Sequence, residues 1–65
     1  MNTKIERDWH ISFRYISPWD HNTPLIHIPT EGTIVSAATA DEAWEKFANS
    51  MEPEERRCLR RLQII

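Results

Sequence analysis

The sequence predicts an α+β fold in which a small antiparallel sheet of three to four strands packs against one main helix. Three patterns carry this prediction: an alternation of apolar and polar residues over 8–16, two β-rich runs over 25–28 and 33–37, and an amphipathic segment over 40–50. A chain of 65 residues has room for one domain, so residues 1–65 are expected to fold as a single unit, with residues 1–7 frayed.

Residues 8–16 are expected to form a strand with two chemically different faces, because the side chains of a strand point to opposite sides with a period of two. Apolar residues alternate with polar ones: Trp9, Ile11, Phe13 and Tyr15 on one face, and His10, Ser12 and Arg14 on the other. The apolar face is expected to contact the helix, and the polar face to meet water or a partner.

Residues 17–24 are expected to form a loop, because two prolines bracket them and Asp20, His21 and Asn22 favour turns. Residues 25–28 are short, apolar and rich in β-branched side chains. A tight turn at residues 29–32 would lead from them into the strand 33–37, with Gly32 free to adopt a positive φ angle. The two runs are therefore predicted to form a hairpin.

The main helix is expected to run over residues 40–50. Thr39 and Glu42 have the spacing of a capping box, in which the two side chains satisfy free N–H groups at the start of a helix. Apolar side chains then recur at helical intervals: Ala40, Ala43, Trp44, Phe47, Ala48 and Met51. Packing this face on the first strand predicts a core centred on four aromatic residues, namely Trp9, Phe13, Trp44 and Phe47.

A second, shorter helix is expected over residues 53–59, since Pro53 suits a first helical turn and two glutamates follow it. The closing Leu-Gln-Ile-Ile favours a final strand, because β-branched residues are enriched in strands. A continuous helix is the alternative for residues 60–65, because the apolar residues from Cys58 to Ile65 also fit helical spacing.

Composition argues against several functional classes. The single glycine, Gly32, rules out a glycine-rich loop of the kind that cradles phosphates in nucleotide-binding enzymes. The candidate metal ligands lack the paired short spacing of zinc sites: His10, His21, His27 and Cys58. Cys58 beside Leu59 is typical of a small buried hydrophobe rather than a nucleophile. A non-enzymatic protein without metal or cofactor is therefore expected.

Charge and cysteine content set further expectations. The net charge of -2 disfavours a broad basic surface that wraps nucleic acid. One cysteine excludes an intrachain disulfide, and no secretory leader or apolar run of membrane-spanning length is visible. These features together indicate a cytoplasmic protein without membrane contact.

Two features are candidates for binding. On a helix, a cluster of arginines would form a compact basic patch for phosphates or an acidic protein surface: Arg56, Arg57, Arg60 and Arg61. The alternative is that the nearby glutamates at positions 52, 54 and 55 pair with these arginines on a solvated face. Trp19 in the loop either anchors a partner or closes one end of a small core. The polar strand face with Arg14, or an exposed sheet edge, offers a further surface.

The order of elements resembles that of many small acidic proteins of bacteria and their phages, without any specific family motif. The resemblance implies an accessory or host-interacting factor that acts by binding. The sequence thus favours a small protein-binding module, an inhibitor or regulator encoded by a phage or mobile element, that uses Trp19, Arg14 and the arginine cluster. The alternative is a nucleic-acid-binding accessory protein using the arginine cluster with Arg14 and Lys46. A third hypothesis is a subunit that completes a site only as an oligomer, and the oligomeric state is left open.

Overall fold

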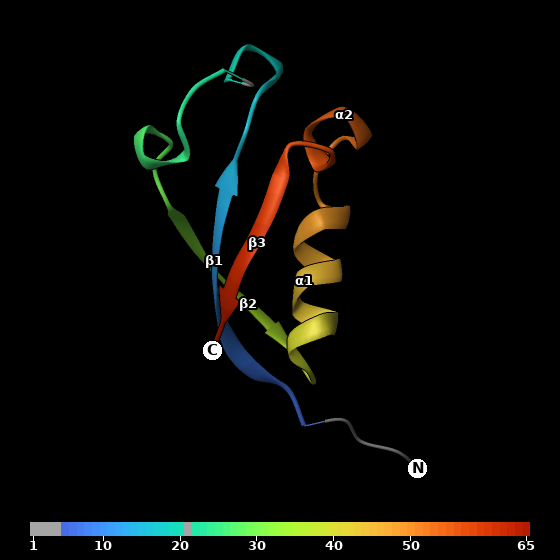
Figure 1. Ribbon diagram of the computed structural model, residues 1–65. Helices are drawn as coiled ribbons and strands as arrows, with labels where there is room; N and C mark the ends of the chain where they lie inside the picture. Colours follow the sequence, from blue (N-terminus) through green and yellow to red (C-terminus); the bar gives the residue numbers. More distant parts are fainter. Residues whose placement is uncertain (1–4, 21) are drawn as a thin grey trace.

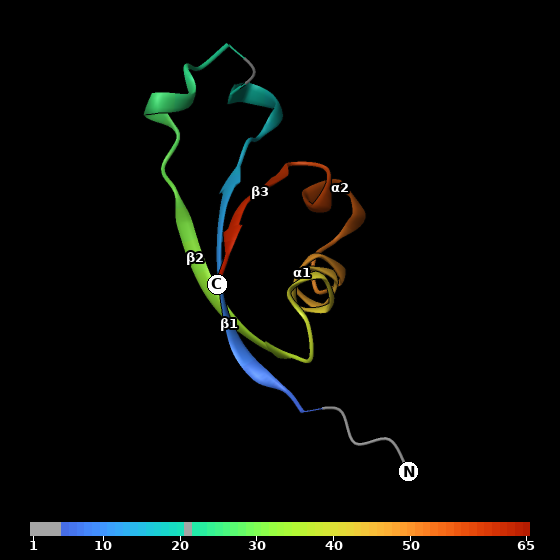
Figure 2. The same cartoon turned by 60° about the horizontal axis from the view of Figure 1, so that its bottom comes forward.

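The computed structural model describes residues 5–20 and 22–65 of the chain. In chain order its elements are β1 (Arg7–Tyr15), the 3-10 helices η1 (Pro18–Asp20) and η2 (Leu25–His27), β2 (Glu31–Ala37), α1 (Ala40–Asn49), α2 (Pro53–Arg56) and β3 (Leu59–Ile64) (Figure 1). The strands form one antiparallel sheet in the order β2-β1-β3, with α1 against one face (Figure 2). The predicted α+β class is confirmed.

Strand β1 lies in the centre of the sheet, and its two faces follow the predicted alternation. Ile11 and Phe13 are buried towards α1, whereas His10 on the opposite face is exposed. The strand begins at Arg7, one residue before the predicted start at Asp8. The expected fraying of residues 1–7 stays a prediction, and residues 1–4 lie outside the described residues.

The predicted hairpin between residues 25–28 and 33–37 is wrong. Leu25–His27 forms the 3-10 helix η2, and β2 pairs antiparallel with β1 instead. Prolines bracket this short run on both sides and remove backbone donors that a sheet ladder needs. The run therefore closes on itself: the His27 N–H donates to the Pro24 carbonyl at 2.9 Å and the Ile28 N–H to the Leu25 carbonyl at 3.0 Å.

Gly32 also differs from its prediction. It lies inside β2 opposite Ser12, and among the described residues no glycine has a positive φ angle. Because β2 starts at Glu31, two residues before the predicted start, Gly32 serves as a strand residue rather than a turn residue.

Helix α1 begins as its capping signal predicts. Thr39 has an extended backbone, with φ −135° and ψ 162°, and its Oγ1 accepts the N–H of Glu42 at 3.1 Å. Loss of such an N-cap side chain typically costs about 1 kcal/mol. The cap marks the residue at which the chain leaves its extended conformation after β2 and enters α1.

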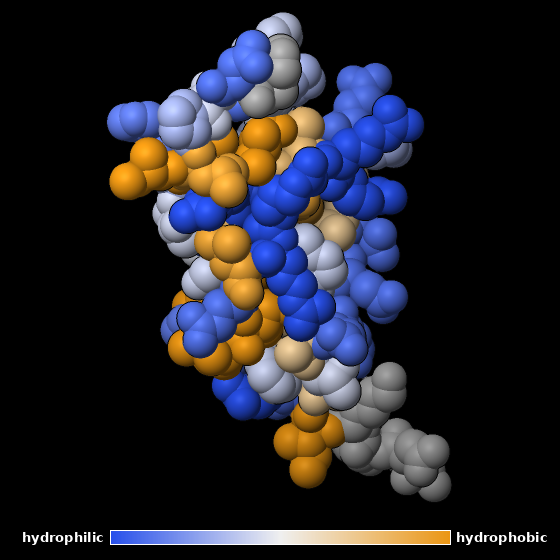
Figure 3. All heavy atoms as spheres, viewed as in Figure 1, coloured by the Kyte–Doolittle hydropathy of each residue, from blue (hydrophilic) through white to orange (hydrophobic). Residues whose placement is uncertain are grey.

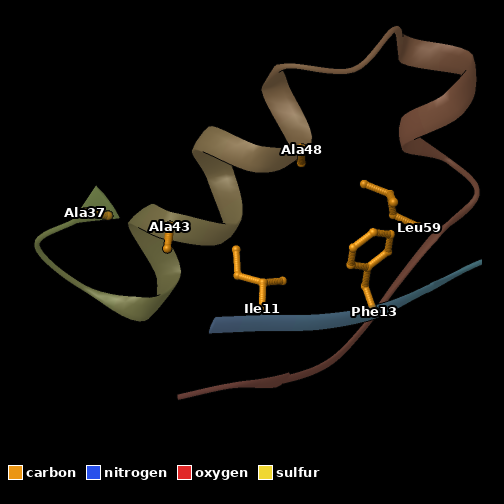
Figure 4. Close-up of a cluster of buried hydrophobic side chains, with 6 residues drawn as sticks. All are labelled: Ile11, Phe13, Ala37, Ala43, Ala48 and Leu59. Carbon is orange, nitrogen blue, oxygen red and sulfur yellow. The ribbon is translucent and has the colours of Figure 1, made fainter. Parts of the chain in front are cut away.

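The core differs from the predicted aromatic centre. Buried residues from the sheet and from α1 meet in one cluster: Ile11, Phe13, Ala37, Ala43, Ala48 and Leu59 (Figure 4). Ile11 is only 1% exposed. Of the four predicted aromatics only Phe13 is buried, while Trp9, Trp44 and Phe47 are partly buried around the cluster. Small alanine side chains let α1 approach the sheet closely, so the bulkier rings lie at the margins of the interface.

The end of the chain forms a short helix and then a strand. Helix α2 ends at Arg56, three residues before the predicted end, and β3 replaces the alternative of a continuous helix. The Cys58 carbonyl accepts the Ile16 N–H at 2.8 Å, and Leu59 is buried in the core. Burial of Leu59 against Phe13 and pairing with β1 favour the strand over continued helix (Figure 4).

Candidate protein-binding surface

Residues 16–30 connect β1 to β2 and form the most prominent irregular segment of the molecule. In both ribbon views this connection extends past the start of β3 and past α2 (Figures 1 and 2). Connections in compact domains usually have about 4–6 residues, and longer ones are commonly functional. This length directs attention to the side chains that the loop presents.

The first part of the loop is held by Asp20. The Asp20 carboxylate accepts the Ser17 hydroxyl at 2.7 Å and the Thr23 hydroxyl at 3.5 Å. Its backbone N–H donates to the Ser17 carbonyl at 2.9 Å, and its carbonyl accepts the Thr23 N–H at 2.9 Å. These bonds shape η1, so Trp19 is presented by a hydrogen-bonded turn. His21, which was predicted to favour a turn, lies outside the described residues.

The loop carries three large apolar side chains that face solvent. Trp19 is 85% exposed, Leu25 55% and Ile26 87%, and we call these three residues the apolar loop surface. Ile28 is buried and ties the second part of the loop to the molecule. Hydrophobic side chains gather at the upper left of the space-filling view, on the side where the loop lies (Figure 3). Of the two sequence interpretations of Trp19, the exposed one matches its position.

Leu25 and Ile26 were not among the predicted site residues. Residues 25–28 were predicted to form a strand, and large apolar residues of a strand are expected to be buried. The signal that separates the two outcomes is the pair Pro24 and Pro29, because a run of four residues between two prolines is too short to pair in a sheet interior.

The arginine cluster does not form the helical patch that its spacing predicted. Arg56 ends α2, Arg57 caps it, and Arg60 and Arg61 belong to β3. Neighbouring residues of a strand point to opposite faces, so Arg60 and Arg61 diverge. The four side chains therefore serve different local roles.

Two members of the cluster contact α1. The Arg56 Nε donates to the Ala48 carbonyl at 3.0 Å, and its Nη2 donates to the Met51 carbonyl at 3.2 Å. Arg56 thus satisfies carbonyls at the C-terminal end of α1, where a positive charge is favourable. Arg61 pairs with Asp41 of α1 at 3.1 Å. Among the described residues this is the ion pair that the cluster forms. The expected ion pairs with the glutamates at positions 52, 54 and 55 are not formed there.

Arg14 and Arg60 form the remaining cationic feature, which we call the arginine pair. They lie directly opposite each other on β1 and β3, on the sheet face away from α1. Arg60 donates its Nη1 to the carbonyls of Arg57 at 2.8 Å and of Leu59 at 2.9 Å. The Arg14 Nε is buried and has no hydrogen-bond partner among the described residues.

The arginine pair is unfavourable in the isolated chain, because like charges directly opposite each other on neighbouring strands destabilise a sheet. A guanidinium with open donors is well suited to a carboxylate or phosphate, which it binds through two parallel hydrogen bonds. An anionic group from a partner would therefore offset the repulsion between the two guanidinium groups. Lys46, the other predicted cation, is engaged elsewhere: its Nζ lies 3.0 Å from a carboxylate oxygen of Glu6 and 2.9 Å from the Ser36 carbonyl.

Cys58 is buried and its thiol donates to the Glu54 carbonyl at 3.6 Å. A hydrogen bond with Cys58, then burial, then the charges of Cys58 and Glu55 raise the pKa of Tyr15 above its ordinary value of 10.0.

Over residues 5–20 and 22–65, no three His, Cys, Asp or Glu side chains are grouped to hold a metal ion, and no pocket is found.

Comparison with known protein families, with curated proteins and with solved structures finds no match to this chain. Within the described residues, no helix has both the length and the apolar character needed to cross a membrane. The function is therefore inferred from the surface itself.

Proposed function

We propose that this protein is a non-enzymatic protein-binding module that engages its partner through the apolar loop surface. The observation that carries the proposal is the exposure of Trp19, Leu25 and Ile26 together on a loop whose turns are closed by internal hydrogen bonds. Isolated exposed apolar residues are ordinary, so the proposal rests on the fact that one loop carries three large ones.

The chemistry of the loop is that of a binding anchor. Tryptophan dominates many interfaces because it buries a large area with little loss of side-chain freedom. A loop that is already ordered by Asp20 pays less conformational entropy when it binds. The arginine pair lies at the end of β1 that leads into this loop, and it favours a partner with an acidic group beside an apolar pocket.

The finer role follows from this mode of action. A small module that occupies a surface of its partner acts as an accessory, inhibitory or regulatory factor, and we propose such a role for a factor of phage or mobile-element type. We also propose that it works in the cytoplasm, because its one cysteine, Cys58, is buried as a free thiol.

Nucleic-acid binding through the arginine cluster is the second candidate, and the arginine pair is the observation in its favour. The distribution of the other cations weighs against it, since Arg56, Arg61 and Lys46 are held by contacts inside the fold. A phosphate-binding surface usually relies on several clustered cations, and its affinity falls steeply with salt.

The test is affinity capture from lysate of the native cell, with and without nuclease treatment, using the full-length protein and two variants. One variant combines Trp19→Ala with Ile26→Ala, and the matched control is Ile5→Ala, because Ile5 and Ile26 are both 87% exposed. Removing an interface anchor typically costs about 2 kcal/mol or more, which corresponds to roughly 30-fold in affinity. We expect one protein to be retained by the wild type and the control and lost by the loop variant.

Circular dichroism establishes that each variant is folded before its binding is interpreted. Equal capture by the loop variant and the wild type would contradict the proposed surface. Recovery that disappears with nuclease and falls steeply with salt would move the assignment to nucleic-acid binding through the arginine pair.

A further inference from the structure

Strand β2 is an edge strand with an open side. The sheet order is β2-β1-β3, so β1 pairs with only one side of β2. In Figures 1 and 2 no other described element runs along the outer side of the upper part of β2. An open edge presents N–H and C=O groups that another strand can pair with.

The hydrogen bonds of β1 show which residues of β2 face outwards. His10 exchanges both of its backbone bonds with Ile65, at 2.8 and 3.0 Å, so its N–H and C=O point towards the β3 side. Ile34 lies opposite His10 on the β2 side of β1, so His10 and Ile34 form a non-hydrogen-bonded pair of that ladder. The backbone groups of Ile34 consequently point away from β1.

The same orientation recurs at every second residue, so Gly32 and Ser36 also direct their backbone groups outwards. The Ser36 carbonyl supports this assignment, because it accepts a hydrogen bond from the Lys46 side chain at 2.9 Å. The outer edge of β2 thus offers donors and acceptors at residues 32, 34 and 36.

Strand β2 itself lacks the residues that usually block pairing between sheets. Natural edges carry lysines, prolines or bulges. Strand β3, at the other edge, has Arg60 and Arg61 and a register shift opposite Ser12 and Phe13. Residues 31–37 contain no proline, lysine or arginine, and their one charged residue, Glu31, lies at the start. Of the two edges, β2 is the one open to another strand.

We propose that β2 pairs antiparallel with β2 of a second copy of this chain, about a two-fold axis at Ile34. Ile34 then pairs with its own symmetry mate, and Gly32 pairs with Ser36 of the other copy. Each of these pairs exchanges two N–H···O bonds, which satisfies the outward donors and acceptors of both strands. The result is one continuous sheet with three strands from each copy.

The side chains fit this pairing. Ile34 is 58% exposed, and the two-fold axis brings it against its symmetry mate on the face away from α1. Glu31 falls opposite Ala37 of the other copy, so no like charges oppose each other. Lys46 does not block the edge, because a carbonyl oxygen has two lone pairs and the Ser36 oxygen can accept a second bond.

The first test is the molar mass of the purified full-length protein as a function of concentration, measured by sedimentation. Ile34→Lys places two positive charges opposite each other at the axis, and Ile65→Lys is the matched control, because Ile65 is 61% exposed and pairs with His10 on the same face. We expect the wild type and the control to dimerise, and the dissociation constant of Ile34→Lys to rise at least tenfold.

A second variant tests the geometry directly. Residues of a hydrogen-bonded antiparallel pair have Cα atoms about 5.5 Å apart, which a disulfide can span. In a Cys58→Ser background, Ile34→Cys is expected to form a covalent dimer on oxidation, whereas Ile65→Cys is not. A monomeric wild type at all concentrations would overturn the proposal and would leave the edge to an extended segment of another protein. Equal cross-linking of the two cysteine variants would also overturn it.

Discussion

Reversing the charge of two adjacent arginines should change the stability of this protein in opposite directions. Arg60 lies directly opposite Arg14, so Arg60→Glu replaces a repulsive cross-strand pair with an attractive one. Arg61 is bonded to Asp41 at 3.1 Å, so Arg61→Glu replaces an attractive pair with a repulsive one. Both substitutions exchange the same residue types in the same edge strand, so the comparison depends on what each side chain faces.

The expected changes in unfolding free energy follow from the kind of charge pair that each arginine forms. A cross-strand charge pair is worth about 0.2–1 kcal/mol, and Arg60→Glu gains such a pair while losing the hydrogen bonds to the carbonyls of Arg57 and Leu59. We expect a net gain of about 0.5 kcal/mol. The Arg61 ion pair is exposed and therefore worth about 0.2–1 kcal/mol, so Arg61→Glu should cost about 0.5–1 kcal/mol.

The assay is urea unfolding at one protein concentration, since dimerisation also contributes to stability. A difference of 1 kcal/mol corresponds to about 4–8 °C in Tm for a domain of this size, so thermal unfolding resolves it as well. Adding Arg14→Gln to Arg60→Glu should remove the gain, and salt should reduce both effects. Shifts of both single variants in the same direction would refute the opposed positions assigned to the two arginines.

Two further predictions concern the core and its pH dependence. Ile11→Ala should cost about 2–5 kcal/mol of unfolding free energy, because Ile11 is 1% exposed beneath α1. Trp44→Ala should cost less, because Trp44 is only partly buried. Urea unfolding compares the two variants, and a larger loss for Trp44→Ala would contradict this core. Because the pKa of Tyr15 is raised in the folded state, the folded protein holds the phenol proton more tightly than the unfolded chain does. The stability that Tyr15 contributes in this way is complete below about pH 10 and is lost as the pH rises through the folded pKa. Ultraviolet titration of the chain's one tyrosine should give a midpoint above 10, which Cys58→Ala lowers; a midpoint at the ordinary value would remove the role assigned to the Cys58 hydrogen bond.

Local signals in this sequence were reliable where local chemistry decides the structure. The Thr39 cap and the alternation in β1 both have causes within a few residues, and both are confirmed. The alternation identified the face that Ile11 and Phe13 share but not the depth of each side chain. Depth depends on how closely α1 approaches, and that distance is set by Ala37, Ala43 and Ala48 across the interface.

The errors have the same origin, because they concern choices between elements that only tertiary contacts decide. Residues 25–28 have strand composition, yet the partner that β1 needs is supplied by β2, which is longer and free of prolines. The arginine cluster fits helical spacing, yet burial of Leu59 and pairing with β1 convert its second half into β3. The arginine pair was therefore not predictable as a pair, since its members are far apart in the sequence and meet only through the sheet register.

The proposed dimer and the proposed binding surface reinforce each other. Each apolar loop surface lies at the start of β2, and antiparallel pairing about Ile34 sends the starts of the two β2 strands in opposite directions. The two loops would then lie at opposite ends of one continuous sheet and remain free to bind. A dimer of this form engages two sites on a repetitive or dimeric partner, and the second contact is intramolecular, so avidity exceeds the affinity of one loop without any new contact. A chain with one small core thereby gains both stability and binding strength from the same edge strand.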